Sequence, residues 1–175
     1  IKKVVWLGIE NNVSNTLKLA CAKLGIRIVI CAPEADPASI DEELNKQAEA
    51  TGLVSHTLDL REALDGADYV HTDTWTNMEF FDTTASILSE VERVGGIKVK
   101  SEFKEEYERR KKIFGPYQLN AALIDKYAPQ AKIMHCMPCH VGYEITRDVI
   151  DHKNSIIFDQ AENRLHIEKG ILTWL

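Results

Sequence analysis

The stretch VVWLGIENNVSNTLKLACAKLGIRIVIC, residues 4–31, contains two apolar runs with a helical segment between them. The first run, residues 4–7, ends at a glycine and is typical of a buried strand. Asn12 is a favourable helix N-cap, and apolar residues recur after it at helical spacing over residues 13–24. Residues 26–31 are a second apolar run. The stretch therefore predicts two parallel strands joined by a helix.

The same alternation continues to the end of the chain. Further strands are predicted at residues 54–58, 68–72, 132–135 and 155–158, and further helices at residues 40–50, 59–64 and 160–174. This pattern predicts an α/β fold, a Rossmann-like three-layer sandwich with a mostly parallel sheet and helices on both faces. Residues 102–112 are nearly all charged, with acid–base pairs at i,i+4, and we expect them to form a solvated helix.

Composition limits the possible functions. A chain of 175 residues, 45% hydrophobic, can bury one core and is expected to be a single domain. Its net charge of −6 argues against nucleic-acid binding, and no apolar run approaches the ~20 residues that span a bilayer. Cys21 and Cys31 lie in apolar periodic segments, so we expect free thiols and a cytoplasmic protein. Because the chain starts at Ile1 and enters a strand at once, we expect it to be a fragment.

Polar clusters follow the predicted strands. In an open parallel sheet, ligands bind beyond the carboxyl ends of the strands, near the point where the strand order reverses. Residues 10–12, 73–78 and 135–140 each follow a strand, and Arg164 lies in the helix after the last one. Their convergence predicts a binding cleft. No G-x-G-x-x-G motif is present, so a dinucleotide site is not supported.

The sequence HCMPCH, residues 135–140, has several interpretations. C-x-x-C-H attaches haem, C-x-x-C is a redox motif, and the flanking histidines suit zinc. Haem attachment and redox chemistry both favour cysteines on a helix, whereas these follow a strand, and zinc has no second Cys/His pair nearby. A buried thiol beside a turn proline, without chemistry, also remains open. We favour a substrate site in which Cys136 and main-chain groups beside Pro138 face a ligand.

Several motifs together resemble a known family. HCMP, followed by GYEITRDVID and SIIFDQAENRLHIEKGILTWL, is similar to the C-terminal domain of ornithine carbamoyltransferases, within the aspartate/ornithine transcarbamylase superfamily. NNVSNTL after the first strand and DTWTNM after the strand at residues 68–72 resemble that family's amino-acid-binding segments, in the same order. The resemblance covers residues 4–175. It implies transfer of a carbamoyl group from carbamoyl phosphate to the side-chain amine of ornithine, giving citrulline and phosphate.

The resemblance also implies roles for individual residues. Asn12 would bind the backbone groups of the amino acid, and Asp73 would hold the side-chain amine and help to deprotonate it. Cys136 and the carbonyl of Met137 would contact the carbamoyl group and the attacking nitrogen, and Arg164 would contact the carbamoyl oxygen. The Met137–Pro138 bond would be cis.

Two further residues belong to the loop that closes over the substrate in the family. Asn77 and Met78 would take this part, although Asn77-Met78-Glu79 stands where the family has Ser-Met-Gly. The segment at residues 79–104 is also longer than expected. Both departures keep an acylated ornithine, a diamine or another amino acid open as substrate.

The implied chemistry requires neither a metal nor an organic cofactor. An amine of lysine type has a pKa near ~10.4 and attacks a carbonyl only when unprotonated. A carboxylate at Asp73 can orient it, a thiolate at Cys136 could accept its proton, and the Arg164 guanidinium suits negative charge on the carbamoyl oxygen.

The family places carbamoyl phosphate on an N-terminal domain, which is absent from residues 1–175. The resemblance therefore implies an amino-acid-binding domain that is inactive alone and a full-length protein that is a homotrimer. The competing hypothesis is an α/β module that binds an amino acid without catalysis. Asp73, Cys136 and Arg164 together favour the enzyme, since a binding module has no need of all three.

Overall fold

The chain, described by a computed structural model over residues 1–76, 78–80 and 99–175, is built on a five-stranded parallel sheet. The strands lie in the order β3-β2-β1-β4-β5. They are β1 (Lys3–Glu10), β2 (Arg27–Ala35), β3 (Val54–His56), β4 (Tyr69–Thr72) and β5 (Lys132–His135). The chain moves outward from β1 to β3 and then returns to the other side of β1 for β4. The strand order therefore reverses between β1 and β4, where an open sheet binds its ligands.

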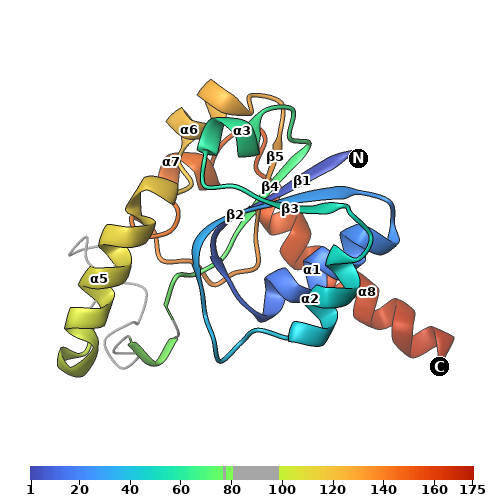
Figure 1. Ribbon diagram of the computed structural model, residues 1–175, viewed down its shortest axis with the longest axis horizontal. Helices are drawn as coiled ribbons and strands as arrows, with labels where there is room; N and C mark the ends of the chain where they lie inside the picture. Colours follow the sequence, from blue (N-terminus) through green and yellow to red (C-terminus); the bar gives the residue numbers. More distant parts are fainter. Residues whose placement is uncertain (77, 81–98) are drawn as a thin grey trace.

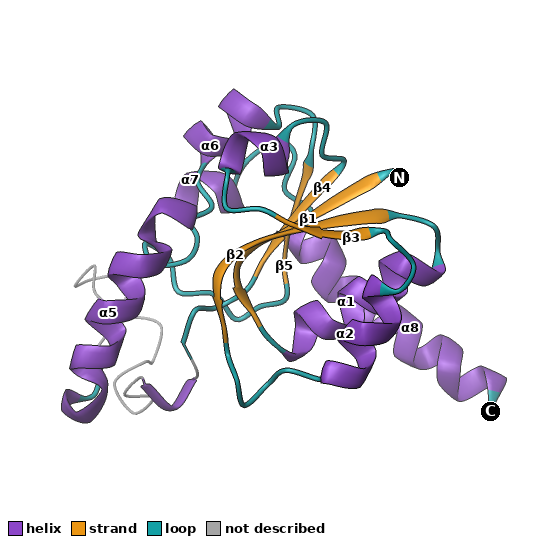
Figure 2. Cartoon of the chain, viewed as in Figure 1, coloured by secondary structure: helices purple, strands orange, loops and turns teal. Residues whose placement is uncertain are grey.

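Helices cover both faces of this sheet (Figures 1 and 2). One side carries α1, α2 and α8, and the other carries α3, α6 and α7. Their bounds are α1 (Asn12–Lys23), α2 (Glu42–Glu49), α3 (Leu60–Leu64), α6 (Ala121–Tyr127), α7 (Arg147–Ile150) and α8 (Ile157–Trp174). The predicted α/β fold with helices on both faces is confirmed.

Alternating side chains of β1 divide the core between the two faces. Val4 and Trp6 pack with Cys21 of α1, whereas Val5 and Leu7 belong to the cluster that contains residues of α3, α6 and α7. All five side chains are at most 7% exposed. Because successive strand residues point to opposite faces, a strand that is apolar at every position must be covered on both sides. This explains why the apolar run at residues 4–7 predicted a buried strand.

Two strands extend further than predicted. β1 continues past Gly8 to Glu10, and β2 continues past Pro33 to Ala35, with Glu10 paired to Ala35. The register shifts between Leu7 and Ile9, and Gly8 adopts a φ of +115° there. Between the pairs that Leu7 and Ile9 make with β2, β2 has one residue more than β1, so Gly8 lies opposite a bulge in β2 and does not end β1. The strand continues and delivers Glu10 to the edge where the polar clusters gather.

The strand predicted at residues 155–158 is wrong. Ser155 makes a single bridge to Ile133, and α8 begins at Ile157. A short apolar run has no period that distinguishes a strand from the first turn of a buried helix. Ile157 is fully buried at the start of α8. It is apolar because it is buried, and not because the chain is extended there.

The helix predicted at residues 102–112 is present as α5 (Lys104–Phe114), but one of its faces is packed against the domain and not solvated. Phe114 is fully buried and stacks on Trp75 with ring centroids 5.6 Å apart. Tyr107 stacks on Tyr143 at 4.5 Å. One face of α5 therefore packs beside the loop that follows β4. The remaining described helices are the single-turn segments η1 (Met78–Phe80), η2 (Ser101–Phe103) and η3 (Gly115–Tyr117).

None of the described helices is both long enough and apolar enough to span a membrane.

Replacing Gly8 with alanine is expected to reduce the free energy of unfolding by about 2–5 kcal/mol, through a strained φ and overpacking together. A Cβ at this position would lie 2.8 Å from Nε1 of Trp75, which is buried. Gly66→Ala is the matched control, since its φ is +66° but nothing lies within 4 Å of the added Cβ. Urea denaturation of the three proteins measures the difference. Equal losses for the two variants would contradict a close approach of Trp75 to Gly8.

Candidate active site

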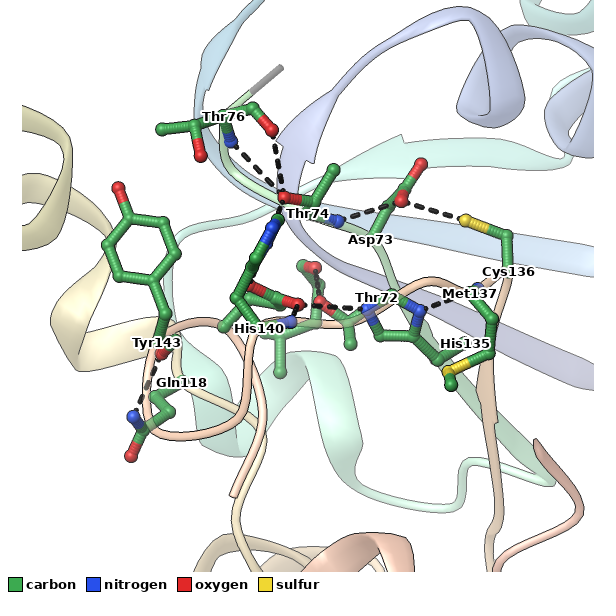
Figure 3. A network of polar contacts seen from close by, with 12 residues as sticks. Thr72, Asp73, Thr74, Thr76, Gln118, His135, Cys136, Met137, His140 and Tyr143 are labelled. Carbon is green, nitrogen blue, oxygen red and sulfur yellow. Dashed lines mark hydrogen bonds and ion pairs between the residues drawn. The ribbon is translucent and has the colours of Figure 1, made fainter. Parts of the chain in front are cut away.

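The polar site lies beyond the carboxyl ends of β1, β4 and β5, on either side of the point where the strand order reverses. Asp73 directly follows β4, and Cys136 directly follows β5. Because β4 and β5 are hydrogen-bonded neighbours, with Thr72 opposite His135, the two residues emerge side by side. The Cys136 thiol donates a hydrogen bond to Oδ1 of Asp73, with 2.7 Å between sulfur and oxygen (Figure 3).

Asp73 is held by donors on both of its oxygens and is only 6% exposed. Oδ1 accepts from the backbone N–H of Thr74 at 2.7 Å as well as from Cys136. Oδ2 accepts from Nδ2 of Asn11 at 2.8 Å, and Asn11 precedes α1. The carboxylate therefore joins three segments that are far apart in the sequence.

The helix cap that the sequence analysis placed at Asn12 is Asn11. Oδ1 of Asn11 accepts from the backbone N–H groups of Val13 and Ser14, and Ser14 Oγ accepts from the backbone N–H of Asn11, which completes a capping box. Asn12 is the first residue of α1 and is exposed. Asparagine is a favourable N-cap at either position, so residue type alone did not distinguish Asn11 from Asn12. The hydroxyl of Ser14, three residues after Asn11, is the sequence signal that favours Asn11 as the cap.

The structure disagrees with a thiolate at Cys136. Burial and then the Asp73 carboxylate raise the pKa of this thiol well above its ordinary value. A protonated thiol can donate to Asp73, whereas a thiolate beside the carboxylate would be repelled. Cys136 is free, and so are Cys21, Cys31 and Cys139. In this arrangement the Cys136 thiol donates to the Asp73 carboxylate and helps to fix its direction.

A tight turn carries the residues after Cys136. The Met137–Pro138 peptide bond is cis, as predicted. Met137 has a φ of +50°, and its backbone N–H donates to Nδ1 of His135 at 2.9 Å. This bond turns the chain back on the end of β5, so that Cys136, Met137 and Pro138 all line one pocket.

That pocket is open, has a volume of about 500 Å³, and brings Arg164 to the site. Its other wall is one face of α8, formed by Ala161, Arg164, Leu165 and Glu168. Arg164 is exposed. The structure thus unites Asp73 with Cys136 by direct contact, and Cys136 with Arg164 across a shared pocket.

A buried carboxylate, Glu144, contacts the turn formed by residues 135–140. Glu144 is fully buried, accepts from the backbone N–H of His140, and lies 3.3 Å from Nε2 of His135 and 3.5 Å from Nδ1 of His140. Thr74 Oγ1 lies 2.9 Å from the same Nδ1 of His140 (Figure 3). Burial alone would raise the pKa of Glu144, but the hydrogen bonds of His135 and His140 outweigh burial and hold that pKa below its ordinary value. The carboxylate therefore braces both ends of the HCMPCH stretch.

The loop after Asp73 is fastened to α5. Arg110 donates from Nη1 to the carbonyl of Trp75 at 2.6 Å and from Nε to Glu106 at 2.7 Å. Of the predicted loop residues, Asn77 lies outside the described residues. Met78 begins a single turn that runs to Phe80, and its side chain also lies outside the described part.

Among the described residues, Asp73, His135 and Cys136 each bring one possible metal-ligand atom within 4.8 Å of the others. Each of these side chains already has a hydrogen-bond partner inside the site. We assign no cation to this group.

Four residues that contact the site were not singled out from the sequence: Asn11, Arg110, Glu144 and Gln160, whose Oε1 accepts from the backbone N–H of His135. Glu144 and Gln160 follow the HCMPCH stretch within GYEIT and DQAENR, but a single sequence does not distinguish a buried polar residue from an exposed one. Arg110 stood in a charged segment that was interpreted as solvated.

Comparison with known proteins gives consistent results. Residues 2–175 match the family described as "Aspartate/ornithine carbamoyltransferase, Asp/Orn binding domain". The chain is 38% identical to the ornithine carbamoyltransferase of Thermococcus kodakarensis over 173 residues, which are 97% of this chain and 48% of the relative. It is 39% identical to that of Methanothermobacter thermautotrophicus over 177 residues, covering 99% of this chain and 51% of the relative.

Solved structures agree with these matches. The ornithine carbamoyltransferase from Pyrococcus furiosus superposes with a TM-score of 0.74 at 35% identity, covering 98% of this chain and 48% of that one. The chain spans about half the length of the curated relatives that it matches.

Proposed function

We propose that this chain, which belongs to the aspartate/ornithine carbamoyltransferase family through its Asp/Orn-binding domain, is the ornithine-binding half of an ornithine carbamoyltransferase. The family predicted from the sequence is confirmed by the match over residues 2–175. The enzyme would transfer the carbamoyl group of carbamoyl phosphate to ornithine, giving citrulline and phosphate, a reaction of arginine metabolism. The observation that carries the proposal is the contact of Asp73 with both Cys136 and Asn11 where the strand order reverses.

Asp73 is the residue that we assign to the reacting amine. Ornithine arrives with a cationic side-chain amine, and a buried carboxylate attracts and orients such a cation. The donors Asn11, Thr74 and Cys136 fix the direction of the carboxylate before the substrate binds. This preorganisation favours a geometry in which the nitrogen lone pair points at the carbamoyl carbon.

The transfer itself forms one bond and breaks another. The neutral side-chain nitrogen of ornithine attacks the carbonyl carbon of carbamoyl phosphate, and the bond from that carbon to the bridging phosphate oxygen breaks, with its electron pair leaving on phosphate. The amine must lose a proton first, and Asp73 is the base that we assign, because Cys136 is a protonated donor. The second proton of the attacking nitrogen leaves with the phosphate.

The remaining roles rest on the family resemblance and on the shared pocket. Arg164 stabilises negative charge on the carbamoyl oxygen, and the carbonyl of Met137 accepts from the attacking nitrogen. Both residues line the pocket beside Cys136. Asn12 binds the backbone end of the amino acid, and Asn77 with Met78 closes over it.

We also propose that carbamoyl phosphate is bound by a second domain and that the complete enzyme is a cytoplasmic homotrimer. The half-length coverage of the relatives supports the second domain, and the four free thiols fit a reducing compartment. No metal or organic cofactor takes part in the proposed step, and the net charge of −6 gives nucleic acid no role.

The experiment is an assay of citrulline formation by this chain alone and by the complete two-domain protein. We expect no citrulline above background from residues 1–175, because positioning of the second substrate is lost with the other domain. The two-domain protein is expected to release citrulline and phosphate in equal amounts. Citrulline made by the isolated chain would contradict the division of the site, and its absence in both proteins would favour a non-catalytic module.

A further inference from the structure

Helix α8, which carries Arg164, is attached to the rest of the domain mainly through its first turn. Ile157 is fully buried, Gln160 is half-buried, and every residue from 161 to 175 is exposed. The residue before the helix, Ile156, makes no side-chain cap hydrogen bond. In Figure 1 the helix leaves the sheet and extends away from the body of the domain. Few contacts therefore decide where Arg164 lies.

Gln160 supplies hydrogen bonds from α8 to two strands at once. Its Oε1 accepts from the backbone N–H of His135 at 3.1 Å, and its Nε2 lies 3.1 Å from Nε2 of His71. His135 is the last residue of β5 and directly precedes Cys136, whereas His71 belongs to β4 and stacks on Trp6 with 4.9 Å between ring centroids. The amide thus spans the two strands whose ends hold Cys136 and Asp73.

The direction of both hydrogen bonds is fixed by chemistry. A backbone N–H can only donate, so the atom of Gln160 that faces His135 is the oxygen, and the amide nitrogen faces His71. The amide nitrogen can only donate, so Nε2 of His71 accepts and the ring proton lies on Nδ1. Burial lowers the pKa of His71 to about 4, which keeps the ring neutral. The hydrogen bond from the amide of Gln160 therefore selects this tautomer.

We propose that Gln160 is a positioning residue for carbamoyl transfer, which sets the register of α8 on β4 and β5 and thereby holds Arg164 opposite Cys136. This inference rests on the function proposed above. Arg164 stands four residues after Gln160 and therefore on the same face of the helix, one turn further along. It lines the pocket with Cys136 and Met137. Gln160 touches no reacting atom and acts through Arg164.

A double-mutant cycle in the two-domain enzyme separates this role from plain stabilisation. Gln160→Met removes both hydrogen bonds at nearly constant volume and is expected to lower kcat about 10–100-fold, with KM for ornithine changed less than about threefold. In an Arg164→Ala background the same change is expected to lower kcat less than about threefold, because the residue through which it acts is gone. Equal losses in both backgrounds would overturn the proposal.

Two further variants sharpen the cycle. Gln160→Glu keeps both links, since a carboxylate accepts from the His135 N–H and from a proton on Nε2 of His71, and kcat is expected to return to within about fivefold of the parent. Gln47→Met is the matched control, because Gln47 is exposed on α2 and its side chain bonds only Glu43 among the described residues. A control as impaired as Gln160→Met would also overturn the proposal.

Nitrogen-15 NMR of His71 in the 175-residue chain tests the hydrogen bonds without any assay of activity. The parent is expected to show a neutral ring protonated at Nδ1, and Gln160→Glu a ring protonated at Nε2. The amide shifts of Arg164 and Leu165 are expected to move more in Gln160→Met than in Gln160→Glu. If the two-domain parent fails to carbamoylate ornithine, the proposed function fails. If the parent is active but His71 keeps one tautomer in all three proteins, the inference about Gln160 fails.

Discussion

Replacing Asp73 with asparagine is expected to lower kcat/KM for ornithine in the two-domain enzyme by about 10²–10⁴-fold, the range associated with loss of a positioned base. The change removes the negative charge that attracts the cationic amine and the group that we assign as its base. It alters the side-chain volume little, so the effect reports chemistry rather than packing. Steady-state kinetics with ornithine as the varied substrate measures it.

The surroundings of Asp73 make asparagine a poor substitute even as a hydrogen-bond partner. Oδ2 accepts from Nδ2 of Asn11, so an amide nitrogen in its place would face another donor. Asn11 cannot reverse its own amide, because its Oδ1 already accepts from Val13 and Ser14 at the start of α1. A buried donor without an acceptor costs about 1–3 kcal/mol, so some loss of stability is expected as well.

Asp65→Asn is the matched control for this prediction. Asp65 is exposed and precedes β4, at the opposite edge of the sheet from Asp73. The kcat/KM of the Asp65→Asn enzyme for ornithine is expected to stay within about twofold of the parent, because a substitution at an exposed residue away from the site has little effect on the fold. An Asp73→Asn enzyme with parental kcat/KM would remove Asp73 from the reaction.

Replacing Glu144 with leucine is expected to reduce the free energy of unfolding of this chain by about 3–5 kcal/mol, as when one member of a buried ionic contact is removed. The variant leaves the backbone N–H of His140 without its acceptor and both histidine rings without their carboxylate. Glu144→Gln preserves an acceptor for that N–H and is expected to lose only about 1–3 kcal/mol. Urea denaturation followed by tryptophan fluorescence measures both.

The difference in unfolding free energy between the parent and Glu144→Gln is expected to depend on pH in one direction. Because the pKa of Glu144 is held below its ordinary value in the folded chain, its contribution to stability is present above the unfolded pKa of about 4.3. The contribution is lost as the pH falls through the folded pKa. The gap between the parent and Glu144→Gln should therefore be largest near neutrality and shrink on acidification. Glu102→Gln is the exposed control, and its unfolding free energy should equal that of the parent both near neutrality and at acidic pH. A difference between the parent and Glu144→Gln that grows on acidification would contradict an ionised Glu144.

Much of the fold was predictable from the sequence because its signals are local. The uninterrupted apolar run at residues 4–7 predicted a strand covered on both faces, and the polar residues after each strand predicted the edge that binds ligand. The failure at residues 155–158 has the same local origin. Of the two isoleucines and the phenylalanine in this run, only Ile157 is buried, whereas Phe158 is 63% exposed. One buried residue fits the end of a strand as well as the first turn of α8.

The interior of the site was less predictable, because it depends on contacts between distant residues. The sequence left a thiolate at Cys136 open as a proton acceptor, but burial of the thiol and the Asp73 carboxylate, 63 positions earlier in the chain, raise its pKa. The importance of Gln160 and Glu144 likewise follows from the histidines that they meet. No local pattern in the sequence contains those pairings.

We propose above that this chain holds the amine that receives the carbamoyl group, and that the amine is the side-chain nitrogen of ornithine. Carbon-13 NMR of the products made from ¹³C-labelled carbamoyl phosphate by the two-domain enzyme tests it directly. Each reaction contains ornithine, an acylated ornithine or a diamine, and reactions without enzyme and with the Asp73→Asn variant correct for spontaneous carbamoylation. We expect a ureido carbon on the side-chain nitrogen of ornithine, with one phosphate released per label and little signal from the variant. A label that appears only on the acylated ornithine or the diamine would exclude ornithine as the substrate, and a label no more abundant than without enzyme would exclude carbamoyl transfer.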